Sequence, residues 1–567
     1  MRFAFSAQNL RHDLFAGITV ALVAIPQSLA YAQLAGVPAY YGLYAALLPT
    51  IVGAVLGSSP QLSTGPVAMT SLLTAASIAP LAQRGTGQFY ELVVLLALLS
   101  GFFQVALGLL RTGVLLNFLS HPVLMGFINA AALIIGLSQL PTLLGIPSRQ
   151  SEHFLADTWR VLLDIDQLHA VSLAFGATAI VLLLAFRRFA PRLPGVLVTV
   201  ALLTAVSHRI DYAALGGRVV GEVPRGLPTL GLPEADWSAM RSLLSPAFVI
   251  ALISFMEAMS SAKVIAVRTR QPWDENRELI AQGLAKIVSA LCHSMPVSGS
   301  FSRSALNLSA QARTALSSVI AALCVLGTLL FFTSLLYDLP KPVLAAIIMV
   351  AVVGLIHPRS VIAAWRASRD DGAAATATFA ATLAFAPNIQ EGIVFGILLS
   401  LGLLLYRMMR PRVAELGMHP DGNLRDARLH QLPPLHPELG MIRFDGALRF
   451  VNASYFEDAV LRLERERPDL RYILVSAAGV NGLDASGVDM LANLIHQLRN
   501  NNIALGMSGV KKQVREVMVR TGLQDLIGER NIFASDHEAL AKLTSEILSR
   551  PPEPPPSPSS SRERGKG

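Results

Sequence analysis

Apolar stretches of about 20 residues, long enough to cross a lipid bilayer, recur along this sequence from Leu14 to Tyr406. Hydrophobic residues make up 53% of the chain and charged residues only 15%. Ordinary soluble domains carry roughly 25% charged residues. The sequence therefore excludes a purely cytosolic enzyme and predicts a polytopic α-helical membrane protein.

Polar breaks between these stretches predict about fourteen transmembrane segments, in a membrane domain that covers residues 1–412. A more polar stretch at 209–241 divides them into two sets, at 14–208 and 246–406. The first set is expected near 14–34, 41–57, 66–80, 90–110, 122–143, 169–186 and 195–208. The second set is expected near 246–267, 278–294, 301–311, 314–336, 342–357, 372–387 and 390–406.

The net charge of +8 is carried largely by arginines in alternate connections between the expected spans, such as Arg187 and Arg188 or Arg268 and Arg270. Positive residues favour the cytoplasmic side of a membrane. We therefore expect a multi-pass protein of the cell (inner) membrane with both termini in the cytoplasm. The basic residues are not gathered on one face, so no nucleic-acid partner is expected.

The third and tenth segments are broken by Ser, Gly and Pro, in SSPQLSTGPVAM and HSMPVSGSFSRSALN. They hold corresponding places in the two sets. Interrupted helices at matching positions indicate inverted repeats with a binding site between half-helix N-termini. The alternative is two loop segments without a function.

The tenth segment predicts an anion site, because a half-helix that begins at Gly299 and Ser300 carries Ser302 and Arg303 in its first turn. Helix N-termini present free N–H groups and partial positive charge. The third segment offers a second helix start, at Thr64 and Gly65 before Pro66. The alternative is that Arg303 extends to water at the membrane surface.

Glu257 lies inside the apolar run FVIALISFMEAMSSAKVIA. An ionisable residue within a span is a functional hypothesis, and Arg303 is its expected partner. Protonation of Glu257 would free Arg303 to hold an anion, which makes a proton-coupling device. A static ion pair is the alternative.

Gln27 and Tyr31 lie four residues apart in the first span, so they share one helix face. Pro26 beside them frees backbone groups. Both side chains can donate hydrogen bonds to a ligand. Such residues also bond helices to one another, and this alternative stays open.

After the membrane domain, residues 413–438 are expected to form a polar linker, and 439–548 alternate strand-like and helical runs typical of a small α/β domain. The Pro- and Ser-rich tail, 549–567, is expected to be disordered. In GLDASGVDML, Asp484 and Ser486 precede a helix, and Ser486 suits its N-cap. A phosphorylation or docking site at Ser486 is the alternative.

The chain resembles the sulfate permease (SulP) family of anion transporters. The resemblance rests on IPQSLAYAQLAGVPAYYGLYAALLP (25–49), GSSPQLSTGPVAM (57–69), SFMEAMSSAK (254–263) and PVSGSFSRSALN (296–307). The C-terminal domain resembles a STAS domain through GLDASGVDML.

This resemblance implies two inverted repeats of about seven spans each, core and gate domains, a homodimer and an elevator-type movement of the core. It implies proton coupling through Glu257 and a regulatory serine at Ser486. It places the anion near Gln27, Tyr31, Ser300, Phe301, Ser302 and Arg303.

The leading hypothesis is proton-coupled uptake of sulfate, a small inorganic anion, by a secondary active transporter. A bicarbonate or dicarboxylate transporter or an anion exchanger of the same fold is the runner-up. An ion channel and a membrane-anchored STAS signalling protein are further alternatives. No enzyme is expected, because no nucleophile–base pair or phosphate-binding loop stands out, and neither a cofactor nor a metal site is expected.

Overall fold

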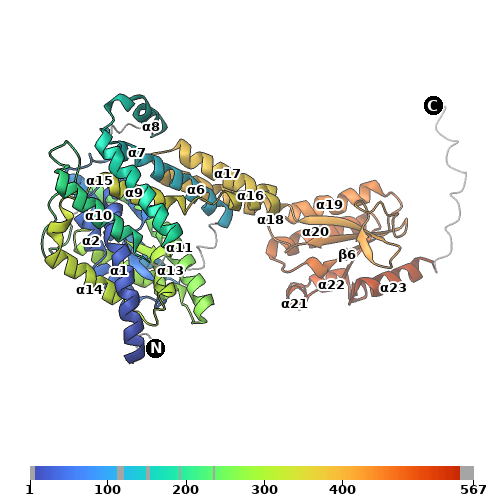
Figure 1. Cartoon of the computed structure of the whole chain (residues 1–567). Helices are drawn as coiled ribbons and strands as arrows, with labels where there is room; N and C mark the ends of the chain where they lie inside the picture. Colours follow the sequence, from blue (N-terminus) through green and yellow to red (C-terminus); the bar gives the residue numbers. More distant parts are fainter. Residues whose placement is uncertain (1–6, 112–119, 148–153, 191–192, 234–236, 549–567) are drawn as a thin grey trace, which may run out of the picture. The chain divides into compact units, whose positions relative to one another are not determined.

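The computed structural model describes residues 7–111, 120–147, 154–190, 193–233 and 237–548. The chain divides into two compact units, Met1–Leu401 and Gly402–Gly567. The first consists almost wholly of helices and the second combines helices with a sheet (Figure 1). The expected disordered tail, 549–567, lies outside the described residues.

Every expected span coincides with a helix or a pair of short helices in the first unit. The first set contains α1 (Ala7–Ala35), α2 (Tyr40–Ala45), α3 (Leu48–Leu56), α4 (Ala68–Ile78), α5 (Gly87–Leu109), α6 (His121–Ser138), α7 (Leu140–Leu144), α8 (Phe154–Leu163), α9 (Ala170–Phe189) and α10 (Gly195–Ile210). The second contains α11 (Trp237–Thr269), α12 (Glu275–Leu291), α13 (Phe301–Ser309), α14 (Leu316–Phe331), α15 (Lys341–Val353), α16 (Pro358–Ala367), α17 (Arg369–Ala384) and α18 (Ile389–Met409).

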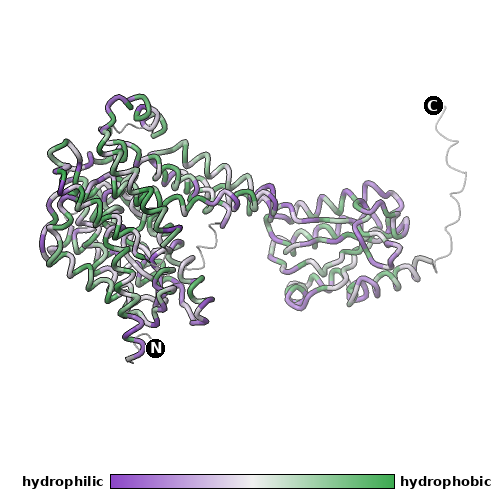
Figure 2. The backbone as a smooth tube through the Cα atoms, in the orientation of Figure 1, coloured by the Kyte–Doolittle hydropathy of each residue, from purple (hydrophilic) through white to green (hydrophobic). Residues whose placement is uncertain are grey.

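Within the described residues, 7 helical stretches are long and apolar enough to cross a membrane. Others are shorter, and α4 and α13 are the half-helices that follow the two broken segments. Hydrophobic residues run along most of this unit, as Figure 2 shows. Two short helices, α8 and α16, were not expected, because each lies in a connection between expected spans.

The broken segments pair as short strands rather than ending in loops. β1 (Ser63–Gly65) and β2 (Ser298–Ser300) are antiparallel, with Thr64 opposite Gly299. All of their residues are buried. Pairing satisfies backbone groups that have no helical partner and cannot reach water. This contact brings the beginnings of α4 and α13 together.

In the second unit, six strands form one sheet in the order β4-β3-β5-β6-β7-β8. The strands are β3 (Arg412–Met418), β4 (Leu424–Asp426), β5 (Leu439–Asp445), β6 (Tyr472–Ser476), β7 (Ala504–Ser508) and β8 (Ile532–Phe533). The pairs from β5 to β8 are parallel, whereas β3 pairs antiparallel with both β4 and β5. The expected linker at 413–438 therefore holds most of β3 and all of β4, which are part of the domain.

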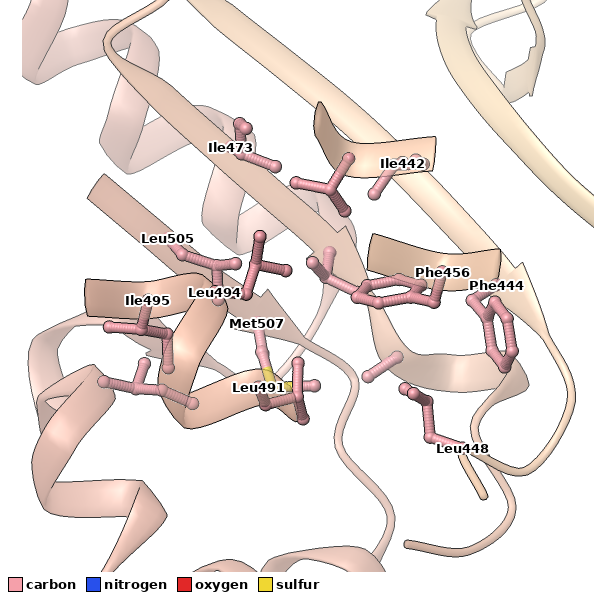
Figure 3. Packing of buried hydrophobic residues seen from close by; sticks show 14 of the residues in the cluster. Ile442, Phe444, Leu448, Phe456, Ile473, Leu491, Leu494, Ile495, Leu505 and Met507 are labelled. Carbon is pink, nitrogen blue, oxygen red and sulfur yellow. The ribbon is translucent and has the colours of Figure 1, made fainter. Parts of the chain in front are cut away.

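Successive side chains of a strand point to opposite faces of a sheet. Alternate residues of the central strands therefore belong to two apolar clusters, one on each face. On one face, Phe444 and Met507 pack with Phe456 of α19 (Ala453–Glu466) and Leu491 of α20 (Ala485–Asn500), as Figure 3 shows. Met518 of α21 (Lys512–Arg520) and Leu523 of α22 (Leu523–Ile527) complete this cluster. On the other face, Met441 and Leu474 pack with Leu540 of α23 (Asp536–Leu548). The sheet is thus covered on both faces.

Candidate anion-binding site

The candidate site lies where β1 and β2 lead into α4 and α13. Ser300 is the N-cap of α13, and its hydroxyl accepts a hydrogen bond of 3.4 Å from the backbone N–H of Arg303. At the start of α4, the N-cap residue Val67 supplies no side-chain bond. Because β1 pairs with β2, the N-termini of α4 and α13 lie together, and each contributes partial positive charge to the site.

Arg303 is almost completely buried, with only 2% of its surface exposed. Its Nη1 donates a hydrogen bond of 2.8 Å to the carbonyl of Pro66, and its Nε donates one of 3.4 Å to the hydroxyl of Ser63. The prediction that Arg303 lies inside the protein is thus confirmed, and its extension to water at the surface is excluded. The guanidinium also joins the two broken segments.

The Nη2 atom of Arg303 is buried and has no hydrogen-bond partner among the residues that the structure describes. A Cβ atom at Gly65 would lie 3.0 Å from this nitrogen, so a glycine there allows the guanidinium to approach the backbone closely. A buried donor without a partner costs roughly 1–3 kcal/mol, and more when it is charged. An anion bound at Nη2 would remove this cost.

Glu257 does not form the expected ion pair. Its Oε2 is buried without a hydrogen-bond partner, and no bond or ion pair between Glu257 and Arg303 is found among the described residues. Two other nitrogens of Arg303 instead donate to Ser63 and Pro66. Glu257 nevertheless belongs to the same region, because α11 packs against β2 and α13. A Cβ atom at Gly299 would lie 2.9 Å from the Cβ of Ala258.

Gln27 and Tyr31 lie on α1, which packs against both half-helices, α4 and α13. Both side chains are buried, and the Oε1 atom of Gln27 has no hydrogen-bond partner. The structure thus brings Gln27, Tyr31 and Arg303 to one region, as expected from the sequence.

The remaining expected residues differ in their surroundings. The Thr64 hydroxyl accepts a hydrogen bond of 2.9 Å from Gln282 on α12, so this side chain supports β1. Phe301 and Ser302 are exposed at the beginning of α13, with 53% of Phe301 accessible. The Ser302 hydroxyl lies 3.4 Å from that of Ser300.

Sequence reasoning missed the polar residues of α12 that hold the site in place. The Glu278 carboxylate accepts hydrogen bonds of 2.6 and 3.1 Å from the backbone N–H groups of Ser58 and Ser59. It also accepts a bond of 3.1 Å from Gln282. Lys286, fully buried two turns further along α12, was missed as well. Their spacing of four residues places all three on one helix face, and this was the available signal.

In the second unit, Asp484 rather than Ser486 is the N-cap of α20. Its Oδ1 accepts a hydrogen bond of 2.9 Å from the backbone N–H of Gly487, and its Oδ2 accepts one of 2.9 Å from that of Phe450. The expectation of a Ser486 cap was wrong, because the helix begins two residues earlier, at Ala485. Ser486 is exposed in the first turn.

Comparison with family models finds the sulfate permease family over residues 10–378 and the STAS domain over residues 433–539. The chain belongs to the sulfate permease family. As a member it is a multi-pass membrane protein and an anion transporter, with a C-terminal STAS domain.

The similarity to curated proteins covers most of both chains. The chain is 32% identical over 553 residues to probable sulfate transporter 4.2 of Arabidopsis thaliana, with 94% of this chain and 81% of that protein covered. It is 34% identical over 526 residues to a probable sulfate transporter of Mycobacterium tuberculosis, with 92% and 93% covered.

Two solved structures share the fold of this family member. Murine Solute Carrier 26 family member A9, an anion transporter in the inward-facing state, matches with a TM-score of 0.87 at 21% identity, over 95% of this chain and 92% of that one. The transmembrane domain of a cyanobacterium bicarbonate transporter, BicA, matches with a TM-score of 0.58 at 25% identity, over 70% of this chain and 99% of that one.

Proposed function

We propose that this sulfate permease family member is a secondary active transporter that takes up sulfate together with protons. The observation that carries the proposal is the buried Nη2 of Arg303, a charged donor without a partner at the beginning of two half-helices. A small oxyanion supplies the acceptor that this donor lacks. Relatives named as sulfate transporters support sulfate as that anion.

Uptake of a dianion requires a driving ion. Moving one charge through 100 mV changes the free energy by about 2.3 kcal/mol, so a dianion entering a negative compartment costs roughly twice that. Glu257, whose buried Oε2 has no partner, is the carboxylate that we assign to carry the proton. A protonated carboxyl donates a hydrogen bond, whereas the ionised form only accepts.

The same proposal includes the expected movement and assembly. We assign an elevator-type shift of the core, two inverted repeats, a homodimer, and a cell-membrane location with both termini cytoplasmic. The β1–β2 pair supports a core that moves as one part, because it joins elements of both repeats. The arginines in alternate connections support the assigned orientation.

A transporter of bicarbonate or a dicarboxylate is the second candidate. It is favoured by the likeness of the membrane unit to the domain named as a bicarbonate transporter. Helix starts and one arginine also recognise negative charge rather than a particular shape. The choice of anion therefore needs a direct measurement.

Uptake of labelled sulfate into proteoliposomes, with and without an inward proton gradient, tests the proposal. Selenate, bicarbonate and succinate serve as competitors. We expect stimulation of sulfate uptake by the gradient and competition by selenate. Transport of bicarbonate or succinate in place of sulfate would overturn the choice of substrate.

The variant Glu257→Gln tests the proton carrier. It is expected to bind sulfate but to lose stimulation by the gradient. Glu275→Gln is the matched control, because Glu275 is a more exposed carboxylate of the same unit, paired with Lys263 at 3.5 Å. Gradient-driven uptake by Glu257→Gln at the wild-type rate would reject Glu257 as the proton carrier.

A further inference from the structure

Lys286 is a buried cation that the site described above does not use. None of its surface is exposed. Its Nζ donates hydrogen bonds of 2.5 Å to Oε1 of Gln104 on α5 and of 2.7 Å to the hydroxyl of Ser254 on α11. An amide oxygen only accepts hydrogen bonds, so the direction of the first bond is certain.

Both acceptors are themselves held in place. The Gln104 amide nitrogen donates to the carbonyl of Ala251 at 3.1 Å and to the Ser254 hydroxyl at 3.3 Å. The Ser254 hydroxyl in turn donates to the carbonyl of Ala251 at 3.2 Å. These fully buried groups are thus arranged to hold an ammonium group. Such an arrangement is what keeps a charge tolerable away from water.

The helix crossing explains why Lys286 reaches this position. A Cβ atom at Gly101 of α5 would lie 2.8 Å from the carbonyl oxygen of Gly283 on α12, and a Cβ at Gly283 would lie 2.8 Å from that of Gly101. Small residues allow two helices to approach this closely. Gln104 and Lys286 each follow their glycine by three residues, so they share its helix face and meet.

A short chain of bonds connects Lys286 to the anion site. Ser254, which holds the ammonium through its hydroxyl, accepts at its carbonyl a hydrogen bond of 2.7 Å from the hydroxyl of Ser298 in β2. Glu257 lies three residues further along the same helix. Among the described residues, the region therefore contains the cations Arg303 and Lys286 and the carboxylates Glu257 and Glu278.

We propose that Lys286 is a specificity-determining residue that makes the core of this transporter select dianions over monoanions. The inference rests on the proposed function and names the charge of its substrate. Lys286 does not touch the anion, and it acts through the electrostatic field at β2. Arg303 and Lys286 carry two positive charges and Glu257 and Glu278 two negative ones, so the ionised side chains balance, and Lys286 offsets the carboxylate of Glu278 on its own helix.

The field of Lys286 favours each additional negative charge on the ligand. The positive charge of Lys286 attracts a dianion twice as strongly as a monoanion at the same position. Removal of the Lys286 charge leaves one negative charge in excess, so a dianion loses more than a monoanion. At an effective dielectric constant of about 20, a charge roughly 10 Å from an anion alters such a preference on the order of tenfold.

The experiment compares sulfate with perchlorate, tetrahedral oxyanions that differ by one charge. Their dissociation constants are measured by calorimetry on the purified full chain at one ionic strength. Lys286→Met is expected to lower the ratio of sulfate to perchlorate affinity on the order of tenfold. Lys263→Met is the matched control, because it removes a half-exposed lysine of the same unit and should leave the ratio unchanged.

Gln104→Glu guards against a Lys286 variant that fails to fold. It retains the lysine and the shape of its acceptor but places a carboxylate beside the ammonium, so the ratio should fall in the same direction. An unchanged ratio of sulfate to perchlorate affinity in folded Lys286→Met or Gln104→Glu protein would overturn this inference and leave the proposed function intact. If the wild-type chain binds neither anion, the proposed function fails and the inference fails with it.

Discussion

The guanidinium of Arg303 donates a hydrogen bond of 2.8 Å to the carbonyl of Pro66, and thereby joins the first turn of α13 to the segment that leads into α4. The Nη1 atom makes this contact, while Nη2 is left without a partner among the described residues. Arginine suits both tasks, because its donors point in fixed and different directions. A residue with a single charged group could hold Pro66 or bind an anion, but not both.

Replacement of Arg303 by lysine should therefore impair anion binding although the charge is retained. We expect sulfate affinity to fall at least about tenfold, because a single ammonium cannot hold Pro66 and the anion in the same geometry. Calorimetry on the purified variant measures the loss. Thermal unfolding serves as the control for folding, and wild-type affinity in Arg303→Lys would contradict the assignment.

Gly101→Ala should destabilise the membrane unit. The added methyl group would lie 2.8 Å from both the carbonyl oxygen of Gly283 and a side-chain carbon of Ile287. Such overpacking costs about 1–3 kcal/mol. Gly136→Ala on α6 is the matched control, because nothing lies within 4 Å of its added methyl group. Equal thermal midpoints for the two variants would show that the crossing of α5 and α12 is looser than described.

Asp484→Ala should destabilise the STAS domain, whereas Ser486→Ala should not. The first change removes the cap on Gly487 and the bond to Phe450, and loss of a cap costs about 1–2 kcal/mol. The second removes an exposed hydroxyl in the first turn of α20, so a change below about 0.5 kcal/mol is expected. Denaturant unfolding followed by a STAS-domain probe distinguishes them, and a larger effect at Ser486 would restore it as a structural residue.

The hairpin of β3 and β4 should lose stability in acid. A hydrogen bond from the backbone N–H of Asn423 holds the pKa of Asp421 at about 2, and one from the N–H of Leu429 lowers the pKa of Asp426. A carboxyl with a lowered folded-state pKa stabilises above its unfolded pKa of about 3.9 and loses this effect as the pH falls toward the folded value.

Hydrogen exchange of residues 412–426, corrected for its intrinsic pH dependence, measures this loss. Protection should decline as the pH falls from about 4 toward about 2. Asp426→Asn should show part of the loss already at neutral pH and a weaker decline in acid. A variant with the same pH profile as wild type would contradict the role of Asp426.

The membrane spans were predictable because each one is an apolar run of sufficient length, a signal that is local in the sequence. The convergence of Arg303 with the third segment was also predictable, from the matching breaks in the two sets of spans. That Arg303 donates to the carbonyl of Pro66 and forms no ion pair with Glu257 was not predictable, because a backbone acceptor has no signature in the sequence.

Other misses have equally specific causes. Lys286 was overlooked because a single cation in an apolar run does not indicate a role until its partners are known. Its partner Gln104 lies 182 residues away in the sequence. Strands β3 and β4 were read as a linker because the prolines after them suggested an irregular segment. The cap of α20 was misplaced by two residues, since Asp484 and Ser486 are both good N-cap residues.

The pairing of β1 with β2 has a consequence for selectivity. Backbone hydrogen bonds, together with the contact of Arg303 with Pro66, set the spacing between the first turns of α4 and α13. Separating these turns would leave buried amides without partners, each at a cost of roughly 1–3 kcal/mol. The β1–β2 pair therefore fixes the distance between the two helix starts. Differences in substrate size among chains with this fold must come from residues around the pair, such as those on α1, and not from that distance.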